Sequence, residues 1–325
     1  MTVLVTGGAG YIGSHMTYAL LDRGEPVVVL DNLSTGRRAL VGEGAGFVEG
    51  DAGDQPLVRR VLRDHGIDAV IHFAGSIVVP ESVEQPLRYY ANNVGTSRAL
   101  VEACIEEGVK AFIFSSTATV YSVDATQPLA EDEPKEPISP YARSKLMTEW
   151  MLEDAARAYD FRPMVLRYFN VAGADTQGRT GQSTPKATHL IKRACQVALG
   201  RVPHLDIFGT DYSTPDGTGI RDYIHVTDLV AAHLLALDGL RAGAAPATYN
   251  VGYGRGLSVR EVVRGMEAVI GRELPVKESA RRPGDPPVLI SDPARIKVAL
   301  GWQPRHAELS EIISSALEWE RRLND

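Results

Sequence analysis

A tyrosine and a lysine stand four residues apart in the segment SPYARSK, where Tyr141 precedes Lys145. Ser139 is typical of a helix N-cap and Pro140 of a first helical residue. The two side chains are therefore expected one turn apart on one helix face, where they address the same small volume. A phenol beside an ammonium suits acid–base chemistry, because the positive charge favours the phenolate.

A glycine-rich turn indicates a dinucleotide site. The segment TGGAGYIG follows the first apolar run and precedes an apolar segment of helical character. Gly7, Gly10 and Gly13 have the spacing G-x-x-G-x-x-G, and Gly8 completes G-x-G-x-x-G with the last two. Between a strand and a helix this pattern lets backbone N–H groups approach a pyrophosphate at the helix N-terminus.

The end of the second predicted strand favours NAD over NADP. Asp31 lies there, 18 residues after Gly13, where a carboxylate accepts hydrogen bonds from the adenosine ribose and repels a 2′-phosphate. Arg37 and Arg38 argue for the phosphate, but we interpret them as solvated loop charges, because Asp31 occupies the discriminating position. Asp51, after the third strand, is placed to meet the adenine amino group; the alternative is an ordinary loop or capping residue.

A tyrosine base near neutral pH needs a large change in pKa. The free side chain has a pKa of ~10, so a drop of about three units, or roughly 4 kcal/mol, is required. Lys145 and the positive charge of an oxidised nicotinamide both favour the phenolate of Tyr141. The hydroxyl of Thr117, in the segment SSTATVY, would hold a substrate alcohol against Tyr141 while a hydride leaves for the ring.

The elements that position these groups alternate along the chain. Apolar runs near residues 2–7, 26–32, 46–51, 68–75, 110–121 and 162–173 are separated by helical patterns near 13–24, 55–65, 92–107 and 140–159. This alternation predicts an α/β fold with a doubly wound parallel Rossmann sheet. Ligands bind at the strand ends of such sheets, so HFAG after the fourth strand and SSTATVY after the fifth should line one crevice.

The pattern becomes irregular after about residue 175, which indicates a smaller C-terminal α/β substrate lobe. We expect the dinucleotide-binding domain over 1–175 and the substrate lobe over 176–325. Two pieces near 223–252, YIHVTDLVAAHLLAL and ATYNVGYG, again have helix and sheet character. They are expected to return to the first domain.

Composition argues against several classes of protein. The net charge of −7 is the opposite of the basic footprint that nonspecific nucleic-acid binding requires. No apolar run approaches the roughly 20 residues of a membrane-spanning helix. The chain contains no HExxH or CxxC, so we expect no metal. Its start resembles a first strand and not a secretion signal, and Cys104 and Cys195 are expected to be reduced, so we expect a cytoplasmic protein.

The glycine pattern, Thr117 and Tyr141-x-x-x-Lys145 resemble the extended short-chain dehydrogenase/reductase family. Within it, VLVTGGAGYIGSH, VIHFAG, ESVEQPLRYYANNV, LRYFNVAGA, DGTGIRDYIHVTDL and RRPGDPP resemble the UDP-glucose 4-epimerases over nearly the whole chain. The resemblance implies that Tyr141 removes the proton of the sugar 4-hydroxyl and that NAD takes the hydride. The 4-keto sugar then turns over and receives the hydride on its other face, which interconverts UDP-galactose and UDP-glucose.

The resemblance also implies particular contacts. Beside the catalytic Thr117, Tyr141 and Lys145, it implies cofactor contacts from the glycine turn and the strand ends, at Gly7, Gly10, Tyr11, Ile12, Gly13, Asp31, Asn32, Ser34, Asp51, Ala52, Phe73, Ala74, Gly75, Asn92, Ser115, Tyr141, Lys145, Tyr168 and Phe169. It implies UDP-sugar contacts at Thr117, Asn170, His189, Leu190, Phe208, Arg221, Arg282, Asp285 and Leu289. The arginines suit this role independently, because a guanidinium can fork onto phosphate oxygens.

Some positions depart from the family pattern. Ile77 stands where a lysine frequently contacts the cofactor, and His189 where an asparagine is common beside the pyrophosphate. Ser122 replaces the glycine of VYG. Leu289 falls at a position that resembles a size gate, where a large tyrosine restricts the pocket. Because leucine is smaller, we expect some activity on UDP-GlcNAc or UDP-GalNAc.

Related activities are alternatives. Sugar-nucleotide dehydratases and decarboxylases share the fold, but a dehydratase requires an Asp-Glu pair where this chain has Ala118 and Thr119. A 4-epimerase of UDP-glucuronate or of a UDP-pentose differs only in a few pocket side chains and stays open. A dinucleotide-binding sensor would have no reason to keep Thr117, Tyr141 and Lys145. The resemblance also suggests a homodimer formed by the helices at 92–107 and 140–159.

Overall fold

The largest element of the protein is a seven-stranded parallel sheet. The computed structural model describes residues 1–325 apart from 185–187, 283–284 and 324–325. Over these residues the sheet has the strand order β10-β6-β5-β4-β1-β2-β3. Its strands are β1 (Thr2–Thr6), β2 (Val27–Asp31), β3 (Gly46–Glu49), β4 (Ile67–His72), β5 (Ala111–Thr117), β6 (Arg162–Tyr168) and β10 (Ala247–Val251).

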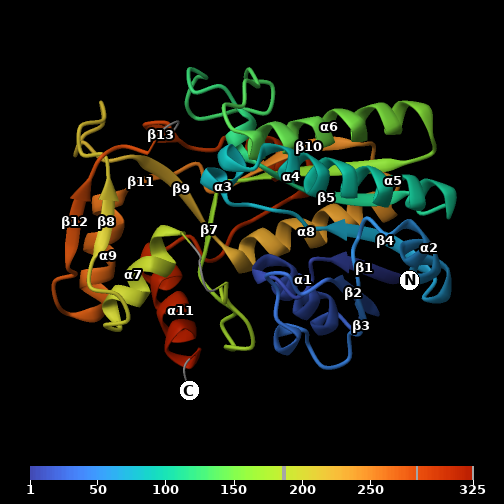
Figure 1. Ribbon diagram of the computed structural model, residues 1–325, viewed down its shortest axis with the longest axis horizontal. Helices are drawn as coiled ribbons and strands as arrows, with labels where there is room; N and C mark the ends of the chain where they lie inside the picture. The colour runs from blue at the N-terminus through green and yellow to red at the C-terminus, as the bar shows by residue number, and fades with distance from the viewer. Residues whose placement is uncertain (185–187, 283–284, 324–325) are drawn as a thin grey trace.

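Helices cover both faces of this sheet. In Figure 1, α5 (Thr96–Glu106) and α6 (Pro140–Ala158) lie above it, whereas α1 (Tyr11–Asp22) and α8 (Val226–Arg241) lie below it. The flanking helices α2 (Gln55–Asp64) and α10 (Ala294–Leu300) extend these two layers. The doubly wound α/β sheet expected from the sequence is confirmed.

Each face of the sheet carries its own apolar core. Strand β1 shows how one strand serves both, because successive side chains point to opposite faces. Val3 and Val5 pack with α1 and α8, whereas Leu4 packs with α2 and α5. The strand order reverses between β1 and β4, so the carboxyl ends of these strands open the crevice in which such sheets bind ligands.

A second, smaller lobe lies on the left in Figure 1. Strand β9 (Ile220–His225) pairs with β7 (Asn170–Ala172), β11 (Gly256–Ser258) and β13 (Val288–Leu289), and β8 (Leu205–Phe208) pairs with β12 (Val276–Ser279). A third core lies among α7 (Leu190–Ala198), α9 (Val259–Ile270) and α11 (Leu309–Arg322). Strand β10 and helix α8 follow β9 in the chain but pack on the large sheet.

Two elements differ from the sequence expectation. The run 162–173 forms two strands, not one: β6 belongs to the large sheet, and β7 pairs with β9 of the second lobe. The helix expected at 92–107 is preceded by the short helices α3 (Val79–Glu84) and α4 (Pro86–Tyr89) and begins with a π-helical turn, Tyr90–Gly95. Such turns frequently occur at functional sites.

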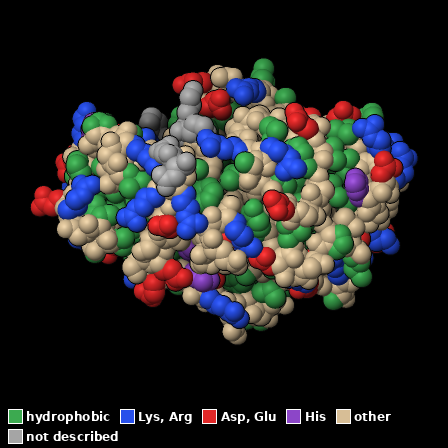
Figure 2. Space-filling model, turned by 90° about the horizontal axis from the view of Figure 1, so that it is seen from below, with side chains coloured by type: hydrophobic (Ala, Val, Ile, Leu, Met, Phe, Trp, Pro, Cys, Tyr) green, Lys and Arg blue, Asp and Glu red, His purple; other side chains and the backbone are tan. Residues whose placement is uncertain are grey.

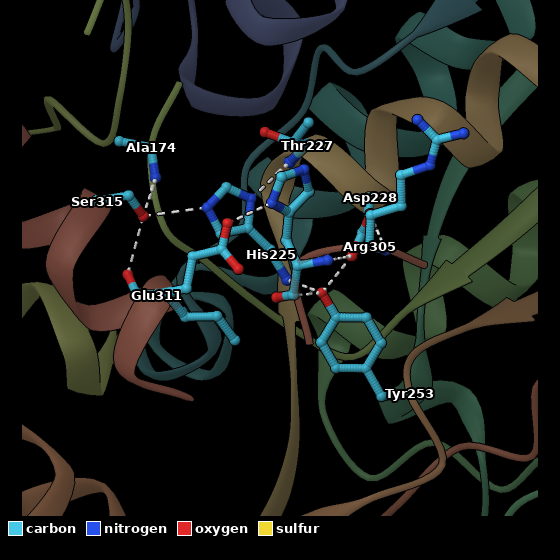
Figure 3. A network of polar contacts seen from close by, with 10 residues as sticks. Ala174, His225, Thr227, Asp228, Tyr253, Arg305, Glu311 and Ser315 are labelled. Atoms are coloured by element: carbon cyan, nitrogen blue, oxygen red, sulfur yellow. Dashed lines mark hydrogen bonds and ion pairs between the residues drawn. The ribbon is translucent and has the colours of Figure 1, made fainter. Parts of the chain in front are cut away.

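A polar network joins the two lobes (Figure 3). The carboxylate of Asp228, on α8, accepts hydrogen bonds from the Tyr253 hydroxyl (2.7 Å) and from the backbone N–H groups of Arg305 and His306 (2.9 and 2.8 Å). His225 accepts a hydrogen bond at Nδ1 from the N–H of Thr227, so its Nε2 carries the proton toward Ser315 on α11. This tautomer excludes His225 as a base for that serine.

The surface is mixed in charge. Figure 2 shows Lys and Arg side chains interspersed with Asp and Glu over the face seen there. Among the described residues, no helix is both long and apolar enough to cross a membrane, and no three His, Cys, Asp or Glu side chains are grouped so as to hold a metal ion. Cys104 and Cys195 are buried free thiols.

Candidate active site

The glycine turn forms a tight backbone cradle at the carboxyl end of β1. Gly7 has a φ of +71°, and a Cβ there would lie 2.7 Å from the backbone nitrogen of Ala74. A Cβ at Gly13 would lie 2.2 Å from the carbonyl oxygen of Gly7. No described side chain caps α1, whose N-cap is Gly10. The free N–H groups of this helix N-terminus are therefore available to an anionic group.

Side chains of the first helical turn face inward. The hydroxyl of Tyr11 donates to the backbone oxygen of Gly173 (2.6 Å), which lies just beyond β7. Ile12 packs against the core between the sheet and α8. The cradle is thus fixed to both lobes.

The loops after β2 and β3 place three polar side chains together. Asp31 is buried, and its two oxygens accept hydrogen bonds from the N–H groups of Ala9 (2.9 Å) and Leu33 (2.8 Å). Asn32 accepts from the N–H of Ser34 (3.1 Å) and donates to Asp51 (3.4 Å). Asp31 therefore ties the glycine turn to the loop on which Asn32 and Ser34 stand.

The neighbourhood of Asp51 completes this loop cluster. Its other oxygen accepts from the N–H of Gly53 (2.7 Å), and Ala52 between them is buried. Arg37 and Arg38 are exposed, and the guanidinium of Arg38 lies 4.4 Å from the centre of the Phe47 ring.

The segment after β4 forms the other wall of the crevice. Ala74 touches the glycine turn, as described above, and a Cβ at Gly75 would lie 3.2 Å from Asn93 Oδ1 and 3.7 Å from Lys145 Nζ. Phe73 packs on the His233 ring, with centroids 5.0 Å apart. The segment 73–75 therefore lies between the dinucleotide cradle and the helix that carries Lys145.

Asn93, in the π-helical turn, holds this wall in place. Its amide accepts from the N–H of Ser76 (2.8 Å) and donates to the Ser76 oxygen (3.0 Å) and to Ser144 Oγ (2.9 Å). Asn92 donates to Ser76 Oγ (3.0 Å). Asn92 was predicted from the sequence as a site residue and Asn93 was not, although the doubled asparagine in YYANNV was an available signal.

His72 is a buried residue at the end of β4 that lies between Thr6 and Ser97. Its Nδ1 lies 2.7 Å from the Thr6 hydroxyl and its Nε2 2.9 Å from the Ser97 hydroxyl, which itself donates to the Asn93 oxygen. Burial, followed by the charge of Lys145, lowers the pKa of His72 to about 3. The ring is therefore neutral and serves as a fixed link between β1, β4 and α5.

Thr117, Tyr141 and Lys145 meet at the end of β5. Ser139 caps α6 by accepting from the N–H of Ala142 (3.2 Å), which starts the helix as its sequence predicts. Tyr141 hydrogen-bonds to Thr117, and Lys145 Nζ donates to the backbone oxygen of Ser115 (2.9 Å). The three side chains expected to act together thus lie around one volume.

Burial dominates the protonation of this set. It raises the pKa of Tyr141, and the hydrogen bond from Thr117 only opposes that effect. Burial also lowers the pKa of Lys145 to about 8, while the charge of Glu149 opposes the change. The sequence led us to expect that Lys145 and an oxidised nicotinamide together lower the Tyr141 pKa. In the folded chain burial has the larger effect, and it raises that pKa.

The aromatic pair after β6 closes the inner side of the crevice. The Tyr168 hydroxyl contacts His233 and hydrogen-bonds to Ser115, and burial strongly raises its pKa. Phe169 is buried in a cluster with Leu289. Tyr168 and Phe169 thus pack beside the end of β5, on the β6 side of the sheet.

The second lobe contributes two hollows that share no lining residue among those described. The first is a small cavity of about 30 Å³, room for a single water, lined in part by Tyr11, Asn170, His189 and Leu190. It lies where β7 and the start of α7 approach the dinucleotide cradle. Three of the expected substrate contacts are therefore brought beside the glycine turn.

The second hollow is an open groove of about 570 Å³, whose described lining includes Arg281 and Arg282 as well as Asp211 and Asp285. Arg282 lies over the Phe208 ring (3.9 Å to its centre), and Arg281 lies over Tyr212 (4.3 Å). Arg221, largely buried, donates to Asp285 Oδ1 (2.5 Å). Tyr212 and Arg281 were not predicted as site residues, because a single Tyr or Arg in a loop is usually an ordinary surface residue.

Leu289 packs between β9 of the second lobe and the end of β5. It stands opposite Arg221 in the β13–β9 pair and is buried with Ala118, Leu146 and Phe169. Ala118 directly follows Thr117. Position 289 therefore lies between Arg221 on β9 and the residue that follows Thr117.

Two of the departures noted in the sequence have clear places. Ile77 is half exposed on the loop before α3. Ser122 is buried and donates to Glu136 (2.9 Å), so a polar partner compensates for its hydroxyl.

A glycine cradle at the switch point of a doubly wound sheet defines the class of dinucleotide-binding Rossmann proteins. A model of the NAD dependent epimerase/dehydratase family matches residues 3–252, and the chain belongs to this family. A protein from Azospirillum brasilense described as UDP-glucose 4-epimerase is 59% identical over 321 residues, which cover 99% of this chain and 92% of that protein.

Two solved structures are close in fold. UDP-glucose 4-epimerase from Brucella ovis, crystallised with NAD, superposes with a TM-score of 0.94 at 47% identity, covering 98% of this chain and 97% of that one. The UDP-Glc/GlcNAc 4-epimerase from Campylobacter jejuni has a TM-score of 0.86 at 46% identity, and each chain is covered to 99%.

Proposed function

We propose that this protein is an NAD-dependent isomerase that interconverts UDP-galactose and UDP-glucose at C4 of the sugar. The observation that carries the proposal is the meeting of Thr117 and Tyr141 at the end of β5, with Lys145 one turn along α6, beside a glycine cradle. The full-length similarity to proteins described as UDP-glucose 4-epimerases supports the same activity.

The residues of the crevice fit a dinucleotide. The cradle excludes any Cβ at Gly7 and Gly13, and α1 offers an uncapped N-terminus to a pyrophosphate. Asp31, at the end of β2, suits ribose hydroxyls and disfavours a 2′-phosphate, which selects NAD. When bound, NAD supplies the hydride acceptor and a positive charge that favours a phenolate nearby.

The catalytic steps assigned to the chain are proton transfers at one hydroxyl. Thr117 orients the sugar 4-hydroxyl, and Tyr141 takes its proton and later returns it. Lys145, whose pKa is about 8, is mainly charged at neutral pH and supports the ionised phenol. Arg221 and Arg282 provide cations for the UDP pyrophosphate, and Phe208 offers a ring face, so that the nucleotide stays fixed while the sugar turns.

A proton NMR time course tests this function. Purified protein is incubated with UDP-galactose and no added cofactor; the appearance of UDP-glucose signals is expected, together with their absence for the variant Tyr141→Phe. An unchanged spectrum, with NAD also supplied, would contradict the assignment. The runner-up substrates, UDP-glucuronate and a UDP-pentose, are then tested in the same way.

A second proposal concerns the width of the sugar pocket. Leu289 is buried in one apolar cluster with Ala118, the residue after Thr117, and a protein 46% identical is described as a UDP-Glc/GlcNAc 4-epimerase. We infer that UDP-GlcNAc or UDP-GalNAc is also accepted. Leu289→Tyr should remove that activity and keep the activity on UDP-galactose. No turnover of either N-acetylated sugar by the wild-type enzyme at high concentration would contradict the inference.

We further propose a homodimer through α5 and α6. These helices lie side by side on one outer face (Figure 1), and Met147 and Trp150 of α6 are 40% and 55% exposed. Sedimentation of the wild type and of Trp150→Glu tests this; a monomeric wild type would contradict it.

We also propose a cytoplasmic location, which agrees with two free thiols. We further propose that the chain is divided into an NAD-binding part (1–175, with 223–252) and a UDP-sugar lobe (176–325).

A further inference from the structure

A buried carboxylate lies one turn beyond the proposed catalytic pair. Tyr141, Lys145 and Glu149 follow one another at four-residue spacing on α6. Each contacts one of the last three residues of β5: Tyr141 reaches Thr117, Lys145 reaches the Ser115 oxygen, and Glu149 accepts a hydrogen bond from the Ser116 hydroxyl. The helix and the strand end are thus joined at three successive points.

Arg167 neutralises this carboxylate. Its Nε lies 3.1 and 3.2 Å from the two oxygens of Glu149, and its Nη2 lies 2.6 Å from one of them. The side chains of Arg167 and Glu149 are only 4% and 7% exposed. A buried ion pair gives little net stability compared with an apolar pair, because desolvation of both charges is costly. Its presence behind Lys145 therefore calls for a role other than stability.

The remaining donors of Arg167 fix the loop that follows Thr117. Nη1 donates to the Tyr121 hydroxyl (2.8 Å) and to the Glu131 backbone oxygen (3.0 Å). In the sheet, Arg167 stands directly opposite Ser116. Glu149, on the helix, thereby holds the end of β5, and Arg167, on β6, holds the loop that follows β5. Thr117 lies between these two points of contact.

We propose that Glu149 is a positioning residue of the reaction: through Ser116 it fixes Thr117 relative to Tyr141, and its charge keeps the ammonium of Lys145 in place. The catalytic role of Glu149 rests on the proposed function. The contacts that Glu149 makes are features of the fold and do not depend on which reaction the protein catalyses.

The charge part of the inference concerns Lys145. The titratable and charged groups around it and around the ion pair are Tyr121, Tyr141, Glu149, His72, Arg167, Tyr168 and Lys135. His72 is neutral near pH 7, and Glu149 is the group whose charge favours protonated Lys145. Loss of that charge therefore lowers the Lys145 pKa further, and the alkaline decline of activity moves to lower pH.

The test compares two kinds of variant with a matched control. Glu149→Gln removes the charge, and Ser116→Ala removes only the link to β5. Glu153→Gln is the control: Glu153 lies one turn further along α6 and pairs with Arg157 at the surface, where both are at least 60% exposed. Circular dichroism first establishes that each variant is folded.

We expect Glu149→Gln to lower kcat for UDP-galactose at least tenfold with little change in KM, because a small displacement of reacting groups is costly, and to shift the alkaline limb of the kcat profile to lower pH. Ser116→Ala should lower kcat severalfold without moving that limb. Glu153→Gln should match the wild type in both. A folded Glu149→Gln protein with wild-type kcat and pH profile would overturn the inference.

Two further measurements keep the result decisive. If Glu149→Gln does not fold, Ser116→Ala decides the positioning role, and unchanged kcat in that variant overturns it. If the wild type itself does not epimerise UDP-galactose, the proposed function fails. The pH titration of the phenol, measured as the ultraviolet difference from the corresponding Tyr141→Phe protein, then tests the inference: a Tyr141 titration unchanged by Glu149→Gln would overturn it.

Discussion

At the residue scale, burial of the charged Lys145 side chain lowers the stability of the folded protein. Its pKa lies at about 8, below its usual value of 10.5, because burial disfavours the charged form and Glu149 offsets only part of this. The unfolded chain therefore binds this proton more tightly than the native protein. Stability is reduced below pH 8 and rises between about pH 8 and 10.5.

Lys145→Met should accordingly make the protein more stable at pH 7. The pKa difference corresponds to roughly 3 kcal/mol, and the lost hydrogen bond to Ser115 takes back about 1 kcal/mol, which leaves about 2 kcal/mol. Urea unfolding at pH 7 and pH 10 measures the difference, which should shrink at the higher pH. Lys110→Met, a change at an exposed lysine, is the control. A less stable Lys145→Met protein at pH 7 would contradict this.

The hydroxyl of Thr117 carries a second prediction. Thr117→Val keeps the shape of the side chain and removes its hydrogen bond to Tyr141. We expect kcat for UDP-galactose to fall about a hundredfold, since the substrate alcohol loses its orienting group. Thr117→Ser retains the hydroxyl and should keep kcat within about threefold of the wild type. Equal activities of the valine and serine variants would exclude the assigned role.

At the scale of elements, the turn between β1 and α1 is the least tolerant segment. A Cβ at Gly13 would lie 2.2 Å from the Gly7 oxygen, whereas one at Gly10 would lie 3.2 Å from it. Backbone atoms cannot yield by the distance that the first contact requires, although they can yield by a few tenths of an ångström for the second.

Gly13→Ala should therefore lose the bound dinucleotide, and Gly10→Ala should lose less of it. The nicotinamide content of the purified proteins, released by denaturation and measured by absorbance, gives the comparison. We expect under about a tenth of the wild-type content for Gly13→Ala, because a displaced turn no longer presents its N–H groups to the pyrophosphate. Wild-type content in Gly13→Ala would show that the cradle does not hold the cofactor.

Most elements of the large sheet were predictable, because their patterns are local. Apolar runs of strand length bounded by glycine or aspartate, and the Ser139–Pro140 helix start, are signals contained in a few neighbouring residues. The end of β6 was not, since no glycine or proline interrupts residues 164–172. Its division depends on β9, about fifty residues later in the chain, which pairs with Asn170–Ala172.

The candidate site divides in the same way. The glycine turn and the Tyr141/Lys145 pair have characteristic spacings, so the sequence identifies them. Glu149 and Arg167 have no characteristic spacing. In the sequence, Glu149 cannot be told from the acidic residues that commonly lie on exposed helix faces, and arginine is common in strands. Only the packing of α6 on β5 and β6 brings them into contact. The burial that raises the Tyr141 pKa is likewise a property of the folded crevice.

At the scale of the whole molecule, Asp228 is the centre of the junction between lobes (Figure 3). It is buried on α8 and accepts hydrogen bonds from Tyr253 and from the backbone of Arg305 and His306. These partners lie after β10 and before α11. The carboxylate therefore fastens the C-terminal segment to the large sheet.

Asp228→Ala should lower the free energy of unfolding by about 3 kcal/mol, because three partly buried donors lose their acceptor. Asp238→Ala offers a matched control on the same helix, since Asp238 forms an exposed ion pair with Arg23; its effect should stay below about 1 kcal/mol. Urea unfolding of both variants gives the comparison. Equal effects would mean that the junction does not depend on Asp228.

The placement of β10 on the large sheet has a consequence for dissecting the protein. The chain leaves that sheet after β6, builds part of the second lobe, and comes back to add β10 as the edge strand beside β6. A fragment that stops before residue 247 would leave the edge of β6 that faces β10 unpaired and open to pairing with other chains. Separate expression of the first lobe should therefore give aggregates, whereas a circular permutant that keeps β10 in the same chain avoids that exposed edge.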